Sequence, residues 1–256
     1  MIENRAGFLG IKFMAVEYEE ALQIMLRHLH NKNGDYFCFA NIHLVMEAVK
    51  NADIMRVLKE SAANFPDGMG VAWALKFLGN KFKDRVRGTD LMLELCRFAS
   101  QNNLKVFLYG SSNETLTALK DRLQKNYEGL RIVGAISPPF RLLKKEEDEL
   151  YVNQINDSNA DILFVSLGAP KQEKWMYEHK GRIKAVQLGV GAAFDFITGR
   201  VKEAPGWMQR AGLEWLYRMP QQPKKTISRM VLVPGFVSGV LGQFVRQKMS
   251  EQRRGT

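Results

Sequence analysis

The chain has 256 residues, of which 46% are hydrophobic, so it can bury the core of one α/β domain or of one domain with an appendage. Its formal net charge of +10 is uneven, because residues 201–256 carry ten Lys and Arg against three Asp and Glu. Such a tail attracts nucleic acid, anionic lipid or phosphorylated ligands. Cys38 and Cys96 lie in apolar runs, and the first ten residues lack the apolar segment of a signal peptide, which argues against a secreted, disulfide-stabilised fold.

Short β-rich runs alternate with helical patterns from about residue 35 to residue 188. Strands are predicted over residues 36–41, 105–110, 131–136, 161–167 and 184–188. Helices are predicted over residues 43–63, 71–77, 91–98 and 146–158, and around Leu116, Leu119 and Leu123. Strands that alternate with helices indicate an α/β fold with a Rossmann-like, doubly wound parallel sheet flanked by helices.

The composition changes near residue 200, which predicts a core over residues 1–200 and a helical, basic and amphipathic appendage over residues 201–256. The appendage begins with an apolar stripe that includes Trp207 and Trp215, with Arg218 beside it. A helix packed on the core would explain part of this stripe. Tryptophan with flanking cations is also typical of a segment at a membrane interface.

The uncharged residues 230–245 form the longest apolar run of the chain, and proline and glycine interrupt it. A bilayer-spanning helix needs about 20 apolar residues. We therefore expect this run to be too short and too interrupted to span a membrane, and to be suited to an interface instead.

Asp67 is the first candidate for catalysis. It lies between Pro66 and Gly68, where an aspartate usually serves only as a turn residue, and that is the simpler interpretation. However, this turn lies inside a compact α/β unit, and in such units the loops at the carboxyl ends of the strands form the ligand crevice. An aspartate in that crevice could act as a general base.

Each of two loops brings cationic side chains to the start of a different predicted helix. Arg85 and Arg87 precede Asp90, which could simply cap its helix, and the functional alternative is an anion site assisted by a guanidinium. Lys171 and Gln172 follow the strongest predicted strand, where a lysine, an amide and free backbone N–H groups meet at one helix start. This second arrangement suits a diphosphate or a sugar hydroxyl.

Gly189 and Gly191 follow a predicted strand and would let a ligand approach the backbone closely. The segment lacks the complete G-x-G-x-x-G pattern, so it is a weak dinucleotide-binding fingerprint. The sequence also lacks a P-loop, an H-E-x-x-H motif and the D-x-D carboxylate pair that holds a metal–diphosphate in many sugar transferases. No metal site and no cofactor are predicted.

Taken in order, these blocks resemble the WecG/TagA/CpsF family of bacterial glycosyltransferases, glycosyltransferase family 26. The strongest parts of the resemblance are Asn41, residues 66–68, Arg85 with Gly88 and Asp90, residues 168–173 and residues 189–218. The family implies metal-independent, inverting transfer of a sugar from a UDP-sugar to a polyprenyl-diphosphate-linked sugar. It places this reaction on the cytoplasmic face of the cell membrane, in teichoic acid, common antigen or exopolysaccharide synthesis.

The resemblance also implies roles for individual residues. Asp67 matches the proposed base, which takes the proton from the acceptor hydroxyl as that oxygen attacks the anomeric carbon. Arg218 matches an appendage arginine that stabilises the leaving diphosphate. The predicted substrate-binding residues are Asn41, Arg85, Asp90, Lys171, Gln172, Gly189, Gly191, Lys225 and Arg229.

The sequence departs from the family pattern at several of these positions. Phe39 stands where the family often has a threonine, and Arg87 where a small polar residue is common. A second appendage arginine is Lys225 here, which keeps the charge but loses the bidentate fork. A third falls at Ser228, next to Arg229, so either of these two could face the site.

The expected partners are the UDP-sugar, the lipid-linked acceptor and the inner surface of the cell membrane, with the protein peripheral and cytoplasmic. Homodimers occur in the family, so a homodimer is also allowed. The donor sugar stays open among N-acetylmannosamine, its uronic acid and glucose. The alternatives from other classes are a basic nucleic-acid-binding protein, for which no signature is present, and a dehydrogenase.

Overall fold

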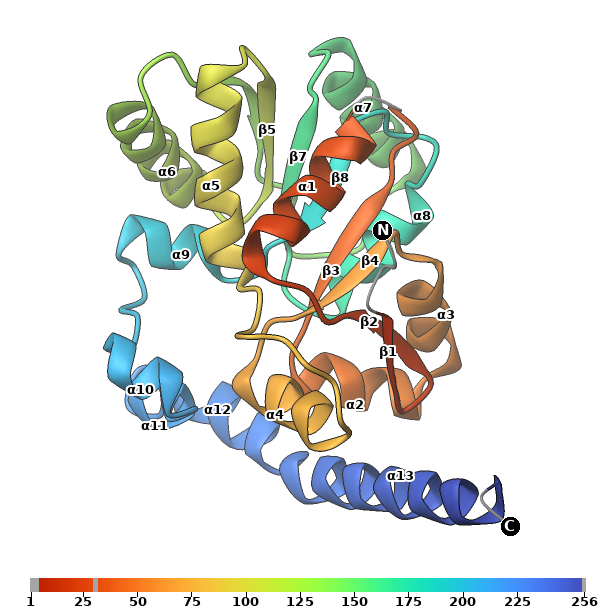
Figure 1. Ribbon diagram of the computed structural model, residues 1–256. Coiled ribbons are helices and arrows are strands. Elements are labelled where there is room, and N and C mark those ends of the chain that lie inside the picture. The colour runs from red at the N-terminus through yellow and green to blue at the C-terminus, as the bar shows by residue number, and fades with distance from the viewer. Residues whose placement is uncertain (1–4, 30–31, 255–256) are drawn as a thin grey trace.

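A six-stranded parallel sheet forms the centre of the computed structural model, which describes residues 5–29 and 32–254 (Figure 1). Across the sheet, the strands are β4 (Ala63–Pro66), β3 (Tyr36–Ala40), β8 (Val186–Gly189), β7 (Ile162–Ser166), β5 (Lys105–Gly110) and β6 (Arg131–Ile136). Strand β3, next to the edge strand β4, is buried along its whole length, as expected for a parallel sheet covered on both faces. The predicted α/β fold is confirmed.

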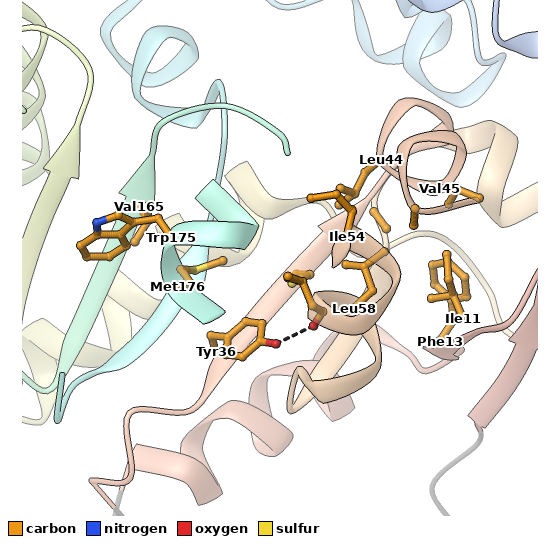
Figure 2. Packing of buried hydrophobic residues seen from close by; sticks show 14 of the residues in the cluster. Ile11, Phe13, Tyr36, Leu44, Val45, Ile54, Leu58, Val165, Trp175 and Met176 are labelled. Atoms are coloured by element: carbon orange, nitrogen blue, oxygen red, sulfur yellow. Dashed lines mark hydrogen bonds between the residues drawn. The ribbon is translucent and has the colours of Figure 1, made fainter. Parts of the chain in front are cut away.

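Helices pack on both faces of the sheet around two hydrophobic clusters. One cluster includes residues of α2 (Ile42–Lys50), α3 (Ala52–Glu60), α4 (Met69–Phe77), α7 (Lys145–Asp157) and α8 (Lys171–Glu178). The other includes residues of α1 (Tyr18–Leu29), α5 (Gly88–Gln101), α6 (Asn113–Asn126) and α9 (Ala193–Thr198). The first cluster contains Tyr36, Leu58 and Met176, and the Tyr36 hydroxyl donates a hydrogen bond to the Val57 carbonyl (Figure 2).

The region predicted as one helix over residues 43–63 is instead two helices followed by a strand, and this prediction was wrong. Asn51 separates α2 from α3, because its side chain accepts a hydrogen bond from the Asp53 N–H and so caps α3. Residues 63–66 then form the edge strand β4, which pairs in parallel with β3. Proline is tolerated at such an edge, so Pro66 does not prevent the pairing.

The N-terminal residues add a two-stranded antiparallel hairpin that the sequence patterns did not indicate. Strands β1 (Arg5–Phe8) and β2 (Ile11–Met14) have four residues each, too few for a clear alternation. Phe8, Ile11 and Phe13 are fully buried and join the first hydrophobic cluster. The hairpin therefore extends the core towards the C-terminal helices.

The C-terminal part of the chain leaves the sheet after α9 and forms four helices: α10 (Gly206–Arg210), α11 (Glu214–Arg218), α12 (Pro223–Met230) and α13 (Val233–Arg254). Helices α12 and α13 pass along α4 and α2 (Figure 1). One side of α13 is held on the core, because Phe236 packs edge-to-face on Phe8 at 5.3 Å and the Gln243 amide bonds the backbone of Gly7 and Leu9.

By length and composition, Pro223–Arg253 is the one helical segment in the described part of the chain that could cross a membrane. The prediction that residues 230–245 are too short to span a membrane is therefore wrong, because they lie within a helical segment that is long enough. Pro234 lies in the first turn of α13, where proline is tolerated, and the glycines stay within the helix. Because one side of α13 packs on the core and the other is exposed, the geometry equally allows contact with a membrane surface.

Candidate active site

A cavity of about 680 Å³ lies at the carboxyl ends of β4, β3, β8 and β7. The loops after these strands form one side of it, and α11, α12 and α13 form the other. This is where open parallel sheets bind ligands, and the size suits a nucleotide-like molecule. The predicted site residues that line it are Asn41, Asp67, Arg85, Gln172, Gly189, Gly191, Arg218, Lys225 and Arg229.

Asp90 and Lys171 do not line the cavity. Asp90 lies in the first turn of α5, where it forms an ion pair with Arg87 at 3.0 Å and keeps 46% of its side chain exposed. Lys171 is exposed at the start of α8. Neighbouring helical residues point in different directions, so the inward position of Gln172 places Lys171 on the outer side.

Asp67 follows the edge strand β4, and hydrogen bonds hold both its backbone and its side chain. Its N–H donates to the Ala40 carbonyl, and its Oδ1 accepts a hydrogen bond from the Gly88 N–H at 3.0 Å. Burial raises the pKa of Asp67, while the Gly88 N–H and the nearby Arg85 and Arg87 oppose that rise. A carboxylate with a raised pKa is a stronger base, which suits proton abstraction.

Asn41 follows β3 and caps α2, because its Oδ1 accepts a hydrogen bond from the Leu44 N–H at 3.2 Å. This cap fixes the side chain at the edge of the cavity. The amide nitrogen takes no part in the cap and carries two donors, so it can bind an acceptor atom of a ligand.

Gln172 lines the cavity, but both atoms of its side-chain amide form hydrogen bonds within the protein. Its Oε1 accepts hydrogen bonds from the N–H groups of Gly168 and Gly191, at 3.2 and 3.1 Å. Its Nε2 donates to the Gly189 carbonyl and to Glu173, both at 2.8 Å. Gly191 has a φ of +58°, a conformation that favours glycine. Gln172 therefore positions two glycine-containing turns that shape the cavity.

Glu173 stands behind Gln172 and is fully buried in the first turn of α8. Its Oε1 accepts the hydrogen bond from Gln172, and its Oε2 has no hydrogen-bond partner among the described residues. Burial raises the pKa of Glu173 to about 7, although the Gln172 hydrogen bond opposes the rise. The carboxyl group therefore changes its charge near neutral pH.

As the pH rises, the Glu173→Gln variant should lose less free energy of unfolding than the parent protein. Between the ordinary carboxyl pKa of 4.5 and about 7, folded Glu173 keeps a proton that the unfolded chain has lost, so raising the pH favours unfolding. The whole effect amounts to about 3 kcal/mol. Thermal melts at about pH 5 and about pH 8 should show a smaller fall in Tm for the variant.

The matched control for that experiment is Glu178→Gln on the same helix, because the Glu178 side chain is 52% exposed. This control should keep the pH dependence of the parent protein. Equal pH dependence of Tm in the parent and in Glu173→Gln would contradict the assignment.

Glu214 of α11 joins an arginine of the core to an arginine of the appendage. Its Oε1 accepts a short hydrogen bond from Arg85, and its Oε2 accepts one from Arg218 at 3.2 Å. The Arg218 guanidinium also lies 4.8 Å from the centre of the Phe196 ring. Glu203 binds Arg87 in a similar way. These ion pairs fasten the appendage to the core and bring Arg218 into the cavity.

Lys225 and Arg229 lie one turn apart on α12 and add positive charge to the cavity. Partial burial lowers the pKa of both groups, and the positive charge of Arg218 lowers both further. Arg229 also lowers the pKa of Lys225. His43 of α2 also lines the cavity, and burial together with Arg229 lowers its pKa. Three cationic or titratable groups therefore share this region.

Sequence reasoning missed His43, Glu214 and Phe196 as cavity residues. A signal existed for two of them. His43 lies in the first turn of the helix that follows β3, two residues after Asn41. Glu214 lies four residues before Arg218, which is the spacing of a helical ion pair. Phe196 follows the glycine turn after β8, but nothing in the sequence indicated that its ring meets Arg218.

The amino-acid sequence is similar to known proteins along most of its length. The model of the "Glycosyl transferase WecG/TagA/CpsF family" matches residues 6–250. An N-acetylglucosaminyldiphosphoundecaprenol N-acetyl-beta-D-mannosaminyltransferase of Bacillus subtilis (strain 168) is 31% identical, over 86% of this chain and 84% of the relative. The protein with the same name from Staphylococcus aureus (strain MW2) is 27% identical, over 92% of this chain and 94% of the relative.

Proposed function

Because the chain belongs to the glycosyl transferase WecG/TagA/CpsF family, we propose that it is an inverting glycosyltransferase that uses a UDP-sugar and a polyprenyl-diphosphate-linked acceptor. N-acetylmannosamine is the transferred sugar that the names of its relatives favour. The product would enter teichoic acid or another cell-surface polysaccharide. The observation that carries the proposal is one cavity that joins Asp67 of the core to Arg218 of the appendage.

In the proposed reaction, Asp67 accepts the proton of the acceptor hydroxyl. The hydroxyl oxygen forms a bond to the anomeric carbon, while the bond from that carbon to the UDP oxygen breaks and its electron pair leaves with UDP. Attack from the face opposite to UDP inverts the configuration. Arg218 and Arg85 balance the charge that develops on the diphosphate. Their shared partner Glu214 is displaced or shifts when the diphosphate binds.

Residues 1–200 are proposed to act as the catalytic core, and residues 201–256 as the appendage that completes the site at the inner face of the cell membrane. The support is a row of large exposed hydrophobic side chains on α11 to α13, which includes Trp215, Val237, Leu241, Val245 and Met249. Such side chains are costly in water and favourable at a bilayer surface. The alternative of nucleic-acid binding has less support, because Lys225 and Arg229 line a partly apolar cavity.

The direct test is transfer to a polyprenyl-diphosphate-linked N-acetylglucosamine, followed by mass spectrometry. UDP-N-acetylmannosamine, its uronic acid and UDP-glucose are offered in turn. We expect one of the three to lengthen the acceptor by one sugar, with UDP-N-acetylmannosamine the leading candidate. Failure of all three donors with an intact, folded protein would overturn the proposed function.

Transfer should be unaffected by EDTA. The sequence has no D-x-D motif, and among the described residues no group of three His, Cys, Asp or Glu side chains could hold a metal ion. Cationic side chains of the cavity would then balance the diphosphate charge. Initial rates with EDTA, and with EDTA followed by excess Mg²⁺, should agree within about twofold, far below the loss that removing one charge-stabilising group causes. A strict requirement for Mg²⁺ would contradict this prediction.

A further inference from the structure

The cavity has two chemically different ends. One end, at the strand termini, is lined by polar groups such as Asn41 and Asp67. The other end lies between α4 and α13 and is lined by Trp73, Phe77 and Leu241, with further aliphatic residues of α13. A cavity that is polar at one end and hydrocarbon-like at the other suits an amphipathic ligand.

The apolar end, called here the α4–α13 trough, leaves large side chains exposed. Trp73 is 48% exposed, Phe77 50% and Leu241 51%. The Phe77 ring lies 4.8 Å from the ring of Phe244, so α13 closes against α4 at one point. Exposed aromatic and aliphatic side chains that line the same trough can bury a hydrocarbon chain.

The cations of α12 stand where the trough begins. Lys225 and Arg229 line the cavity, and the chain continues from them directly into Val233 and Val237 of the trough. Arg85 and Arg218 share the Glu214 carboxylate, but in the described part of the chain Lys225 and Arg229 form no salt bridge. Asp195 and Asp67 attract these cations only from beyond salt-bridge distance. Two cations that no described carboxylate contacts, in a partly closed cavity, attract an anionic ligand.

His43 completes this group from the core side. Its Nδ1 is buried and has no hydrogen-bond partner among the described residues, and its Nε2 lies 3.8 Å from Glu47. A neutral histidine can donate a hydrogen bond to a phosphate oxygen. The anion-binding groups therefore come from both α2 and α12, on two sides of the same space.

We propose that this part of the cavity binds the acceptor, with its diphosphate against Lys225, Arg229 and His43 and its isoprenoid chain in the α4–α13 trough. The inference rests on the proposed function and deepens it, because it separates the acceptor diphosphate from the donor diphosphate, which lies at Arg85 and Arg218. Charge complementarity and the continuity of cations and trough select a lipid diphosphate as the occupant.

The trough is tested with acceptors of different chain length in detergent. Leu241→Asn should raise the KM for a long-chain polyprenyl acceptor by about tenfold, because burial of the chain is lost, and the increase should shrink to about twofold for an acceptor with a short alkyl chain. Val245→Asn is the matched control: it is 53% exposed on the same helix but does not line the cavity. Equal effects of Leu241→Asn and Val245→Asn, or no dependence on chain length, would overturn the proposal.

The cation site is tested by equilibrium binding, which does not depend on turnover. Arg229→Ala should raise the Kd for farnesyl diphosphate by about tenfold and change the Kd for UDP by no more than about twofold. Lys224→Ala is the matched control, since Lys224 is exposed on the same helix and does not line the cavity. A larger loss for UDP than for farnesyl diphosphate would show that Arg229 serves the donor and would overturn the assignment.

A final measurement separates the acceptor from ordinary membrane lipid. Sedimentation with phosphatidylglycerol vesicles should be the same for Arg229→Ala and Lys224→Ala. If Arg229→Ala lost vesicle binding while farnesyl diphosphate still bound normally, the cations would face lipid headgroups and the proposal would fail. Farnesyl diphosphate binding does not depend on which sugar is transferred. Failure of this acceptor site can therefore be distinguished from failure of the three UDP-sugars to support transfer.

Discussion

Asp67→Asn should lower kcat by about 10² to 10⁴-fold, the range expected for loss of a general base. Asparagine keeps an oxygen that can accept the hydrogen bond from the Gly88 N–H, so the loop should stay in place. An amide cannot take the proton of the acceptor hydroxyl at neutral pH. The fold, followed by Tm, and the Kd for UDP should therefore change little while turnover is lost.

Asp90→Asn is the matched control for this prediction. It makes the same chemical change at a carboxylate that does not line the cavity, although its ion-pair partner Arg87 does. We expect its kcat to stay within about threefold of the parent, since surface ion pairs contribute little. Substantial turnover by Asp67→Asn, or equal losses in the two variants, would mean that Asp67 is not the base.

Arg218→Ala should lower kcat by about 10² to 10³-fold, the usual loss on removal of one charge-stabilising group. The guanidinium is held between Glu214 and the Phe196 ring, and its Nε has no hydrogen-bond partner among the described residues. Arg218 therefore lines the cavity with a donor that no described protein atom uses. Lys225→Ala should lower kcat less and act more strongly on the acceptor KM, because Lys225 is assigned to the acceptor diphosphate.

The control for Arg218→Ala is Arg210→Ala, which removes an exposed arginine of the same appendage that does not line the cavity. Its kcat and KM should match those of the parent protein. If Arg218→Ala were as active as Arg210→Ala, the appendage would not supply the charge that balances the leaving diphosphate.

Local sequence patterns predicted secondary structure correctly where a segment is regular and strongly apolar. The strands predicted over residues 36–41 and 161–167 are observed over residues 36–40 and 162–166, because buried parallel strands leave continuous β-rich runs. The same reasoning failed at β4, where four residues that end in proline follow an apolar helix. It also failed at Asn51, which looks unremarkable in a helical pattern until its capping hydrogen bond is seen.

The sequence by itself determined the parallel sheet and the approximate position of the ligand site, because β-rich runs and the polar residues that end them are local features. Only the tertiary structure decided which side chains reach the cavity. Lys171 and Gln172 are neighbours, yet one is exposed and the other is 2% exposed with its amide bound on all sides. Arg85 meets Glu214 across 129 residues of chain, and α13 lies against α4 through Phe77 and Phe244. Such contacts depend on how helices pack in space, and the periodicity of one segment carries no information about its distant partner.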